Sequence, residues 1–501
     1  MNLTTGHIIG IVGTLALMTG VGLYAGRKVK TATDFTTGGG KVGWLVIAGT
    51  ILGTLIGGAS TIGTAQLAFE VGFSAWWWTL GGGIACAVMG LFMVDRLWAS
   101  KVETIPQYLV KTYGPHIGPV ASIFTSVGIL FNVIAASLAF IALLMAMFPI
   151  SAETASAIGG VLILSYVIFG GIWGAGMTGF VKVLLVYLAM ITCGVTAYMM
   201  LGGFSGMTAR WPSFPTFSLF GRGFGKDFAA GFSMVVGVLS TQTYVQAVLS
   251  GKSAWESRKA AFLSALLSPP VGLGGILVGL YMRANFPQTA SKEVFPVFIL
   301  KFLPPVLAGI VLAALFITIV TGMAGLILGI STMLTRDIYQ KIIRPKAEGK
   351  EALLMQRLLI VAVCLTAIVI ANFNREKLML DFSFMSMGLR GCTVLFPLLA
   401  AMFLPRLVTP LAGVAATVLG PLVCIGWYFY PLPLPLPQFF LKDPLYMGLL
   451  ASLATLVIVS LFRHKTARYL LIGCMLLATT CADAARPPRK TVDESSGNLN
   501  T

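Results

Sequence analysis

The chain carries GTLIGGAS at residues 53–60 and GVLSTQTY at residues 237–244, each near the middle of a hydrophobic stretch long enough to cross a bilayer. A continuous helix satisfies its own backbone hydrogen bonds, whereas glycines and hydroxyl residues in such short runs predict a break. The freed carbonyls and amides cannot be solvated by hydrocarbon, so they must face an ion, a solute or a water-filled cavity. The two stretches therefore predict a pair of broken helices around a binding site, an arrangement typical of membrane transporters.

Composition places these breaks in a polytopic, all-α membrane protein. Of 501 residues, 57% are hydrophobic and only 10% are charged, which is far too apolar for a soluble globule. Stretches of roughly 20 apolar residues predict thirteen spanning helices. They begin near residues 6, 42, 74, 117, 154, 177, 228, 258, 304, 353, 381, 408 and 444.

The basic residues predict the orientation of these spans. A net charge of +17 would suggest nucleic acid binding in a soluble protein, but most of the 34 Lys and Arg residues fall in alternate loops. Basic loops face the cytoplasm and anionic lipid. We therefore predict a multi-pass protein of the plasma (inner) membrane, with its N-terminus outside, its C-terminus inside, the lipid bilayer around it and no nucleic acid partner.

The order and direction of the spans predict two groups of five helices that cross in opposite directions, each beginning with a broken helix. The expected organisation is an extra N-terminal transmembrane helix (1–26), a first five-helix repeat (42–202), a second five-helix repeat (228–404), two additional C-terminal helices (405–462) and a cytoplasmic tail (463–501). Within the tail, residues 469–482 are short for a span, which leaves a segment lying in the membrane interface as the alternative.

Residues for catalysis or metal binding do not cluster in this pattern. Six of the seven cysteines lie in apolar runs without paired spacing, and the three histidines are far apart. The sequence therefore predicts neither a disulfide framework nor a metal cluster. An enzyme is disfavoured because no set of acidic, histidine or cysteine side chains gathers at membrane depth.

Several strings resemble the sodium/solute symporter family, whose members share the LeuT-type five-plus-five inverted-repeat fold. They are DFTTGGGKVGWL (34–45), GTLIGGAS (53–60), TIPQYLVKTYG (104–114), GKSAWESRKA (251–260), AALFITIVTGMAG (313–325) and TRDIY (335–339), in the family's order. The resemblance implies symport, in which a cation moving down its gradient carries a small organic solute inward by alternating access. It implies no cofactor other than Na+ as the coupling ion.

By the same resemblance, the sodium ion lies between the first break and the eighth core helix. The implied ligands are the carbonyls of Gly53, Ile56 and Thr318 and the hydroxyl of Thr321, and oxygen ligands suit a hard cation of this kind. The family commonly has a second hydroxyl directly after the last of these, where this chain has Gly322.

A second departure from the family lies in the fifth core helix. The family often carries an acidic residue there and a glutamine three places later, where this chain has Gly179 and Lys182. An ammonium aimed at the sodium position would replace the ion, so proton-coupled or sodium-independent transport is an alternative. The other interpretation is that Lys182, about 8 Å from the inner end of its helix, snorkels to the interface.

Arg390 is predicted to lie about 14 Å inside its span, at 1.5 Å per residue. An unpaired charge at such depth costs about 3 kcal/mol or more, and no acidic residue of the chain falls at mid-span. The guanidinium therefore predicts either a carboxylate-type anionic solute, held by paired hydrogen bonds, or a cap on backbone carbonyls at a helix break.

Other polar residues in the two breaks are predicted to line the solute site, with helix–helix hydrogen bonding as the alternative for each. They are Ser60, Thr241, Gln242 and Tyr244. The tryptophans at 76–78 are interpreted as an anchor in the membrane interface. Thr79 stands where sugar-transporting relatives carry an acidic group, which disfavours a sugar.

The leading hypothesis is therefore sodium-coupled import of a small anionic organic solute. The alternatives are transport with Lys182 in place of the cation and, from a different class, a membrane sensor that binds a solute without accumulating it.

Overall fold

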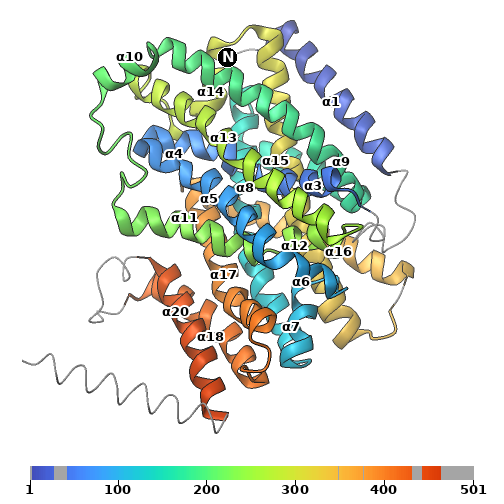
Figure 1. Cartoon of the computed structure of the whole chain (residues 1–501). Helices are drawn as coiled ribbons and strands as arrows, with labels where there is room; N and C mark the ends of the chain where they lie inside the picture. The colour runs from blue at the N-terminus through green and yellow to red at the C-terminus, as the bar shows by residue number, and fades with distance from the viewer. Residues whose placement is uncertain (1–2, 27–41, 348, 376, 432–442, 464–501) are drawn as a thin grey trace, which may run out of the picture.

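The computed structural model of the chain describes residues 3–26, 42–347, 349–375, 377–431 and 443–463, without the side chains of residues 22, 23, 25, 26, 162, 163, 165–178 and 463. Helices make up nearly all of this part, and the β contact within it is an isolated bridge between Val42 and Gly251. The α-helices are α1 (Thr5–Gly26), α3 (Trp44–Leu55), α4 (Thr64–Val71), α5 (Trp77–Val88), α6 (Val94–Ala99), α7 (Ile105–Tyr113), α8 (Ile117–Met147), α9 (Ala152–Met200), α10 (Gly203–Arg210), α11 (Phe224–Leu239), α12 (Gln242–Leu249), α13 (Ala254–Asn285), α14 (Val294–Phe302), α15 (Pro305–Met333), α16 (Gly349–Phe373), α17 (Met379–Phe403), α18 (Pro410–Phe429) and α20 (Pro444–Arg463) (Figure 1).

Both predicted breaks are present. α3 ends at Leu55, residues 56–58 are irregular, and a π-helical segment (Ala59–Gly63) leads into α4. In the second broken helix, α11 ends at Leu239 and α12 begins at Gln242, with a bend of 43° between them. The prediction of two interrupted helices from their glycine and hydroxyl content is confirmed.

Nine helices among the described residues are long and apolar enough to cross a membrane, or ten if the bent pair α11–α12 counts as one span. The count of thirteen spans and the outside N-terminus stay predictions. The predicted interfacial segment 469–482 and the cytoplasmic tail from 464 onward lie outside the described residues.

One stretch differs from the sequence prediction. α9 runs as a single helix of 49 residues, where two spans beginning near 154 and 177 were expected. The intervening residues 169–179 are rich in glycine, but they contain no proline and no charged side chain. Proline and charged residues, two of the usual signals for the end of a helix, are therefore missing from this stretch.

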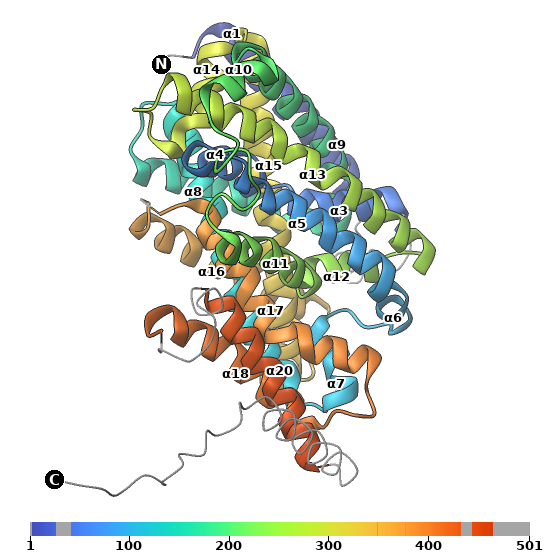
Figure 2. The same cartoon turned by 60° about the vertical axis from the view of Figure 1, so that its left-hand side comes forward.

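The packing of the helices sets which of them surround the breaks. In α15, 89% of the most apolar window is buried, against 22% in α16, so α15 is central and α16 is peripheral. α1 packs on α9 and α15 (Figure 1). α18 and α20 pack on each other and on α17 at the other end of the molecule (Figure 2). The first broken helix thus lies beside α15, α9 and α13, and the second beside α17 and α5.

Candidate functional site

Lys182 of α9 reaches the first break. Its side chain is fully buried, and its ammonium donates hydrogen bonds to the carbonyl of Gly53 in α3 and, at 3.0 Å, to the carbonyl of Thr318 in α15. Both carbonyls belong to the set that the resemblance implies for sodium. The ammonium therefore occupies the position expected for the ion, and the snorkelling interpretation of Lys182 is wrong.

A glycine one turn earlier brings the lysine into place. A Cβ atom at Gly179 would lie 2.1 Å from the carbonyl oxygen of Gly49, so the backbones of α9 and α3 are in direct contact there. Residues three apart share a helix face. Lys182 consequently faces α3 at the next turn of that helix, where Gly53 offers its carbonyl.

The hydroxyl of Thr321, the side-chain ligand that the resemblance implies for sodium, is engaged within its own helix, as is the hydroxyl of Thr318. The hydroxyl of Thr321 donates to the carbonyl of Ile317 at 2.8 Å, and the hydroxyl of Thr318 donates to the carbonyl of Ala314 at 2.6 Å. Gly322 contributes no hydroxyl, although a Cβ atom there would lie at an ordinary 3.4 Å from Gly57. A hard cation needs several oxygens to replace its hydration shell. Because an ammonium already holds two of them, the residues at this position do not fit a sodium ion.

Arg390 links α17 to the second break. Its Nη1 donates to the hydroxyl of Thr241 at 2.6 Å, its Nε to the carbonyl of Ser386 at 3.0 Å and its Nη2 to the hydroxyl of Ser386 at 2.8 Å. The guanidinium is fully buried, and no carboxylate of the described residues pairs with it. Arg390 thus reaches the second break through the hydroxyl of Thr241 and not through a backbone carbonyl there, and its charge has no counter-ion among the described residues.

The hydroxyl of Ser60 forms a hydrogen bond with a tryptophan side chain. Its hydroxyl donates to the carbonyl of Leu55 at 2.8 Å and accepts a hydrogen bond from the indole of Trp78 at 3.0 Å. Trp78 is only 2% exposed, and the indoles of Trp76 and Trp77 donate to backbone carbonyls far along the chain. The prediction of an interfacial anchor at 76–78 is therefore wrong for Trp78, because its N–H has a buried partner that sequence spacing does not reveal.

Gln242 contacts a different part of the fold. Its side-chain carbonyl accepts from the amide of Ile105 at 2.9 Å, and its side-chain amide donates to the carbonyl of Glu103 at 2.9 Å. Gln242 thus joins the second break to the start of α7. Tyr244, also predicted to line the solute site, is 1% exposed.

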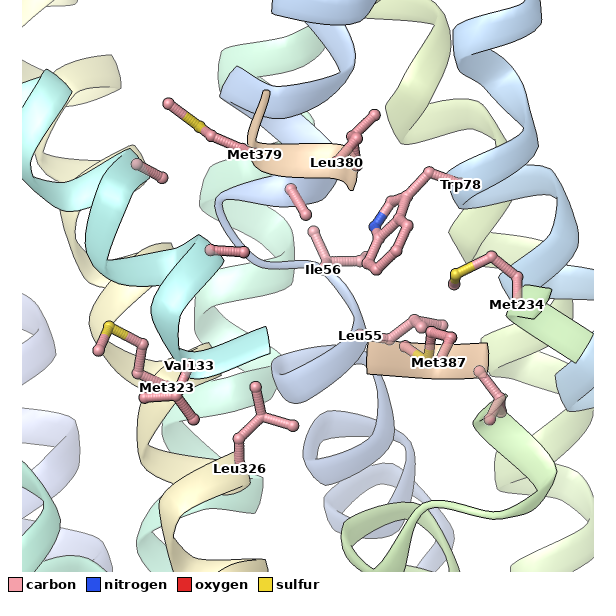
Figure 3. Close-up of a cluster of buried hydrophobic side chains, with 14 of the residues drawn as sticks. Leu55, Ile56, Trp78, Val133, Met234, Met323, Leu326, Met379, Leu380 and Met387 are labelled. Atoms are coloured by element: carbon pink, nitrogen blue, oxygen red, sulfur yellow. The ribbon is translucent and has the colours of Figure 1, made fainter. Parts of the chain in front are cut away.

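Apolar side chains fill the space around the first break. Leu55 and Ile56 lie in a buried cluster with Trp78 and Met387 (Figure 3). Met387 also packs on the second broken helix, since a Cβ atom at Gly237 would lie 2.5 Å from its own. The structure therefore brings Arg390 and Thr241 together, but in this conformation the predicted solute residues are packed rather than exposed to a cavity.

A cavity of about 490 Å³ lies to one side, between α8, α11, α16, α17, α18 and α20. Its charged lining residues are Arg222, Lys226, Lys377, Asp381 and Asp443, and it extends to Gly388 and Leu389, the neighbours of Arg390 in α17.

One cation of this lining is only partly satisfied. Arg222 forms an ion pair of 2.6 Å with Asp227, yet its buried Nη2 has no acceptor in the described chain. The sequence analysis missed this cavity because Arg222 and Lys226 lie between the two predicted repeats, 42–202 and 228–404. The available signal for the cavity was that its basic residues lie close to the ends of predicted spans, within residues 203–226 and 374–378.

Two interrupted helices that flank a central helix, with buried cations at both breaks, define a membrane transporter of the LeuT-type fold. The chain belongs to the sodium:solute symporter family, whose profile matches residues 35–418. It is a transport protein and not an enzyme, because its relatives and its fold are those of transporters.

Named relatives and a solved structure agree with this assignment. The chain is 24% identical over 509 residues to the high-affinity choline transporter 1 of Caenorhabditis elegans, covering 91% of this chain and 85% of the relative. It is 22% identical over 372 residues to the high-affinity proline transporter of Bacillus subtilis, covering 70% and 77%. The substrate-bound, outward-open structure of a Na+-coupled sialic acid symporter matches with a TM-score of 0.74 at 19% identity, covering 92% of this chain and 98% of that chain.

Proposed function

We propose that the protein carries a small anionic organic solute, of the carboxylate type, inward by alternating access. The observation that carries this proposal is Arg390, a fully buried guanidinium without an ion pair among the described residues. A charge left in this state costs about 3 kcal/mol or more in a membrane. A carboxylate would balance it and accept the paired hydrogen bonds that a guanidinium donates best.

The lateral cavity supports the same class of solute. Lys226 and Lys377 line it beside Arg222, whose ion pair with Asp227 leaves its Nη2 without an acceptor in the described chain, so the lining offers donors to an anionic group. The sulfur of Met387 lies 3.1 Å from Nη2 of Arg390. The cavity reaches Gly388 and Leu389, so it ends beside the turn of α17 that carries Arg390.

The names of the similar proteins do not identify the solute of this chain. The names of the relatives include choline, proline and glucose, which are a cation, a zwitterion and a neutral sugar. The anionic solute therefore rests on the residues of this chain.

The driving ion is a separate point. Sodium is part of the names of a sodium/glucose cotransporter of Vibrio parahaemolyticus and of the Na+-coupled sialic acid symporter, and the family makes it the first candidate here. Lys182 favours a second candidate, sodium-independent transport, because its ammonium holds the carbonyls of Gly53 and Thr318.

Uptake measurements test the proposed solute class. The purified chain in proteoliposomes is expected to accumulate at least one radiolabelled small mono- or dicarboxylate. Arg390→Gln is expected to raise the KM for that acid at least about tenfold, which corresponds to the loss of one charge-assisted hydrogen bond. Arg344→Gln, at an exposed arginine, is the matched control and is expected to leave the KM unchanged.

Arg390→Lys separates binding from folding, because it keeps the charge but loses the fork of donors. If it elutes as folded protein, its KM is expected to lie between those of wild type and Arg390→Gln. An unaltered KM in both variants would remove the anion site from Arg390, and uptake of neutral solutes alone would reject the solute class.

A further inference from the structure

We infer that Lys182 supplies from the chain itself the positive charge that a coupling sodium ion supplies in the family, and that sodium is excluded from this position. The inference depends on the proposed function in one respect, which is that this position lies inside a transporter. It concerns the ion and not the solute.

The first support is the geometry of the ammonium. It donates to Gly53, in the last turn of α3 before the break, and at 3.0 Å to Thr318, on the central helix α15. The lysine therefore bridges the broken helix and α15 through two of the three carbonyls that the resemblance implies for the ion. An ion can leave such a bridge, whereas an ammonium tethered to α9 stays in the protein.

The second support is that this chain has Gly179 in place of the family's acidic residue, which would balance a second positive charge. Two positive charges sharing the carbonyls of Gly53 and Thr318 would repel each other strongly at the low dielectric of a buried site. The acidic side chain that the family often carries nearby has no room here, because a Cβ atom at Gly179 would lie 2.1 Å from the backbone of Gly49. The close contact that brings the lysine into place thus also excludes a balancing carboxylate.

The third support is the loss of one ligand. Gly322 stands where the family commonly has a hydroxyl, and no side chain replaces it. The space remains, since a Cβ atom at 322 would lie 3.4 Å from Gly57 and 3.9 Å from the carbonyl oxygen of Gly53. The position keeps the carbonyls of Gly53 and Thr318. Where the family commonly has a hydroxyl and a glutamine, this chain has Gly322 and Lys182. These residues suit a cation that belongs to the chain itself.

Binding of radioactive sodium to the purified full chain, in detergent with potassium as the background salt, tests the inference without any solute. The readout is the part of sodium binding that Thr321→Val removes, because this hydroxyl lies 3.4 Å from the carbonyl oxygen of Thr318 that accepts from Lys182. In the wild type this part is expected to be absent. In the double variant Lys182→Gln with Gly322→Ser, this part of sodium binding is expected to appear and to be saturable. Removal of the like charge is expected to raise the affinity of the position for sodium at least about a hundredfold.

Two further variants isolate the ammonium. Gly322→Ser alone keeps Lys182 and is expected to bind no sodium at this position. Gly322→Ser combined with Lys350→Gln, which neutralises an exposed lysine of α16, is expected to behave in the same way. Gel filtration and the midpoint of thermal unfolding report whether each variant is folded.

Two results would overturn the inference. The first is sodium binding in the wild type that Thr321→Val removes, a measurement that needs no change at Lys182. The second is a folded double variant that gains no such binding, since the ammonium would then not be what excludes the ion. Failure to find a transported acid would count against the proposed solute class and would leave these measurements unaffected.

Discussion

Replacement of Gly179 by alanine is expected to destabilise the protein by about 3 kcal/mol, the upper part of the range for overpacking a buried contact. The added Cβ would lie 2.1 Å from the carbonyl oxygen of Gly49 and 2.8 Å from its carbonyl carbon. Both atoms belong to backbone, so neither can rotate away. α9 must then move off α3, which also withdraws the ammonium of Lys182 from Gly53.

Thermal unfolding of the detergent-solubilised protein measures this effect. Gly426→Ala in α18 is the matched control, because no atom lies within 4 Å of a Cβ at that position. Alanine is favoured over glycine in a helix by up to about 1 kcal/mol, so the control is expected to unfold at the same temperature as the wild type or slightly above it. Equal midpoints for the two variants would show that α9 and α3 are not in close contact.

Replacement of Asp337 by alanine is expected to cost about 3 kcal/mol. This carboxylate is fully buried in the first turn of the π-helical segment (Leu334–Ile343) that continues α15, and it accepts from the hydroxyl of Thr104 at 3.0 Å and of Ser122 at 3.1 Å. Hydrogen bonds to a charged group contribute about 1.5–3 kcal/mol each, and their donors would lose a buried acceptor. The ion pair of 3.6 Å with Lys341 adds little, because that lysine is 41% exposed.

Asp95→Ala is the control for this prediction. Asp95 pairs with Arg258, but their side chains are 60% and 30% exposed, and such surface pairs contribute about 0–1 kcal/mol. Asp337→Asn, which keeps one acceptor oxygen, is expected to unfold between the wild type and Asp337→Ala. A midpoint for Asp337→Ala no lower than that of Asp95→Ala would contradict the role of this carboxylate in fixing α7 and α8 to α15.

The TRDIY string illustrates what a motif predicts and what it leaves open. Its presence at 335–339 contributed to the family resemblance, but nothing in the string indicated that its aspartate would bind Thr104, 233 positions away. The same holds for Gln242, which the sequence placed at the solute site and which binds Glu103 and Ile105 instead. In both cases the partner is set by the packing of separate helices.

The sequence by itself determined the class of fold, the two interrupted helices and the family. These follow from local properties: apolar length measured against the bilayer, and glycines and hydroxyls that cannot sustain a helix at 53–60 and 237–244. Depth within its span also identified Arg390 as a cation that needs a partner, whereas Lys182 was identified as a departure from the family's pattern.

Only the tertiary structure decided what those two cations contact. The spacing of Lys182 from its helix end allowed both snorkelling and a site at the break, and the contact of Gly179 with Gly49 selects the latter. Arg390 likewise reaches Thr241 because α17 packs on α11. The reason is physical: a buried charge is stabilised by whichever oxygens the neighbouring helices bring within about 3 Å, and that distance depends on how backbones approach one another across the fold.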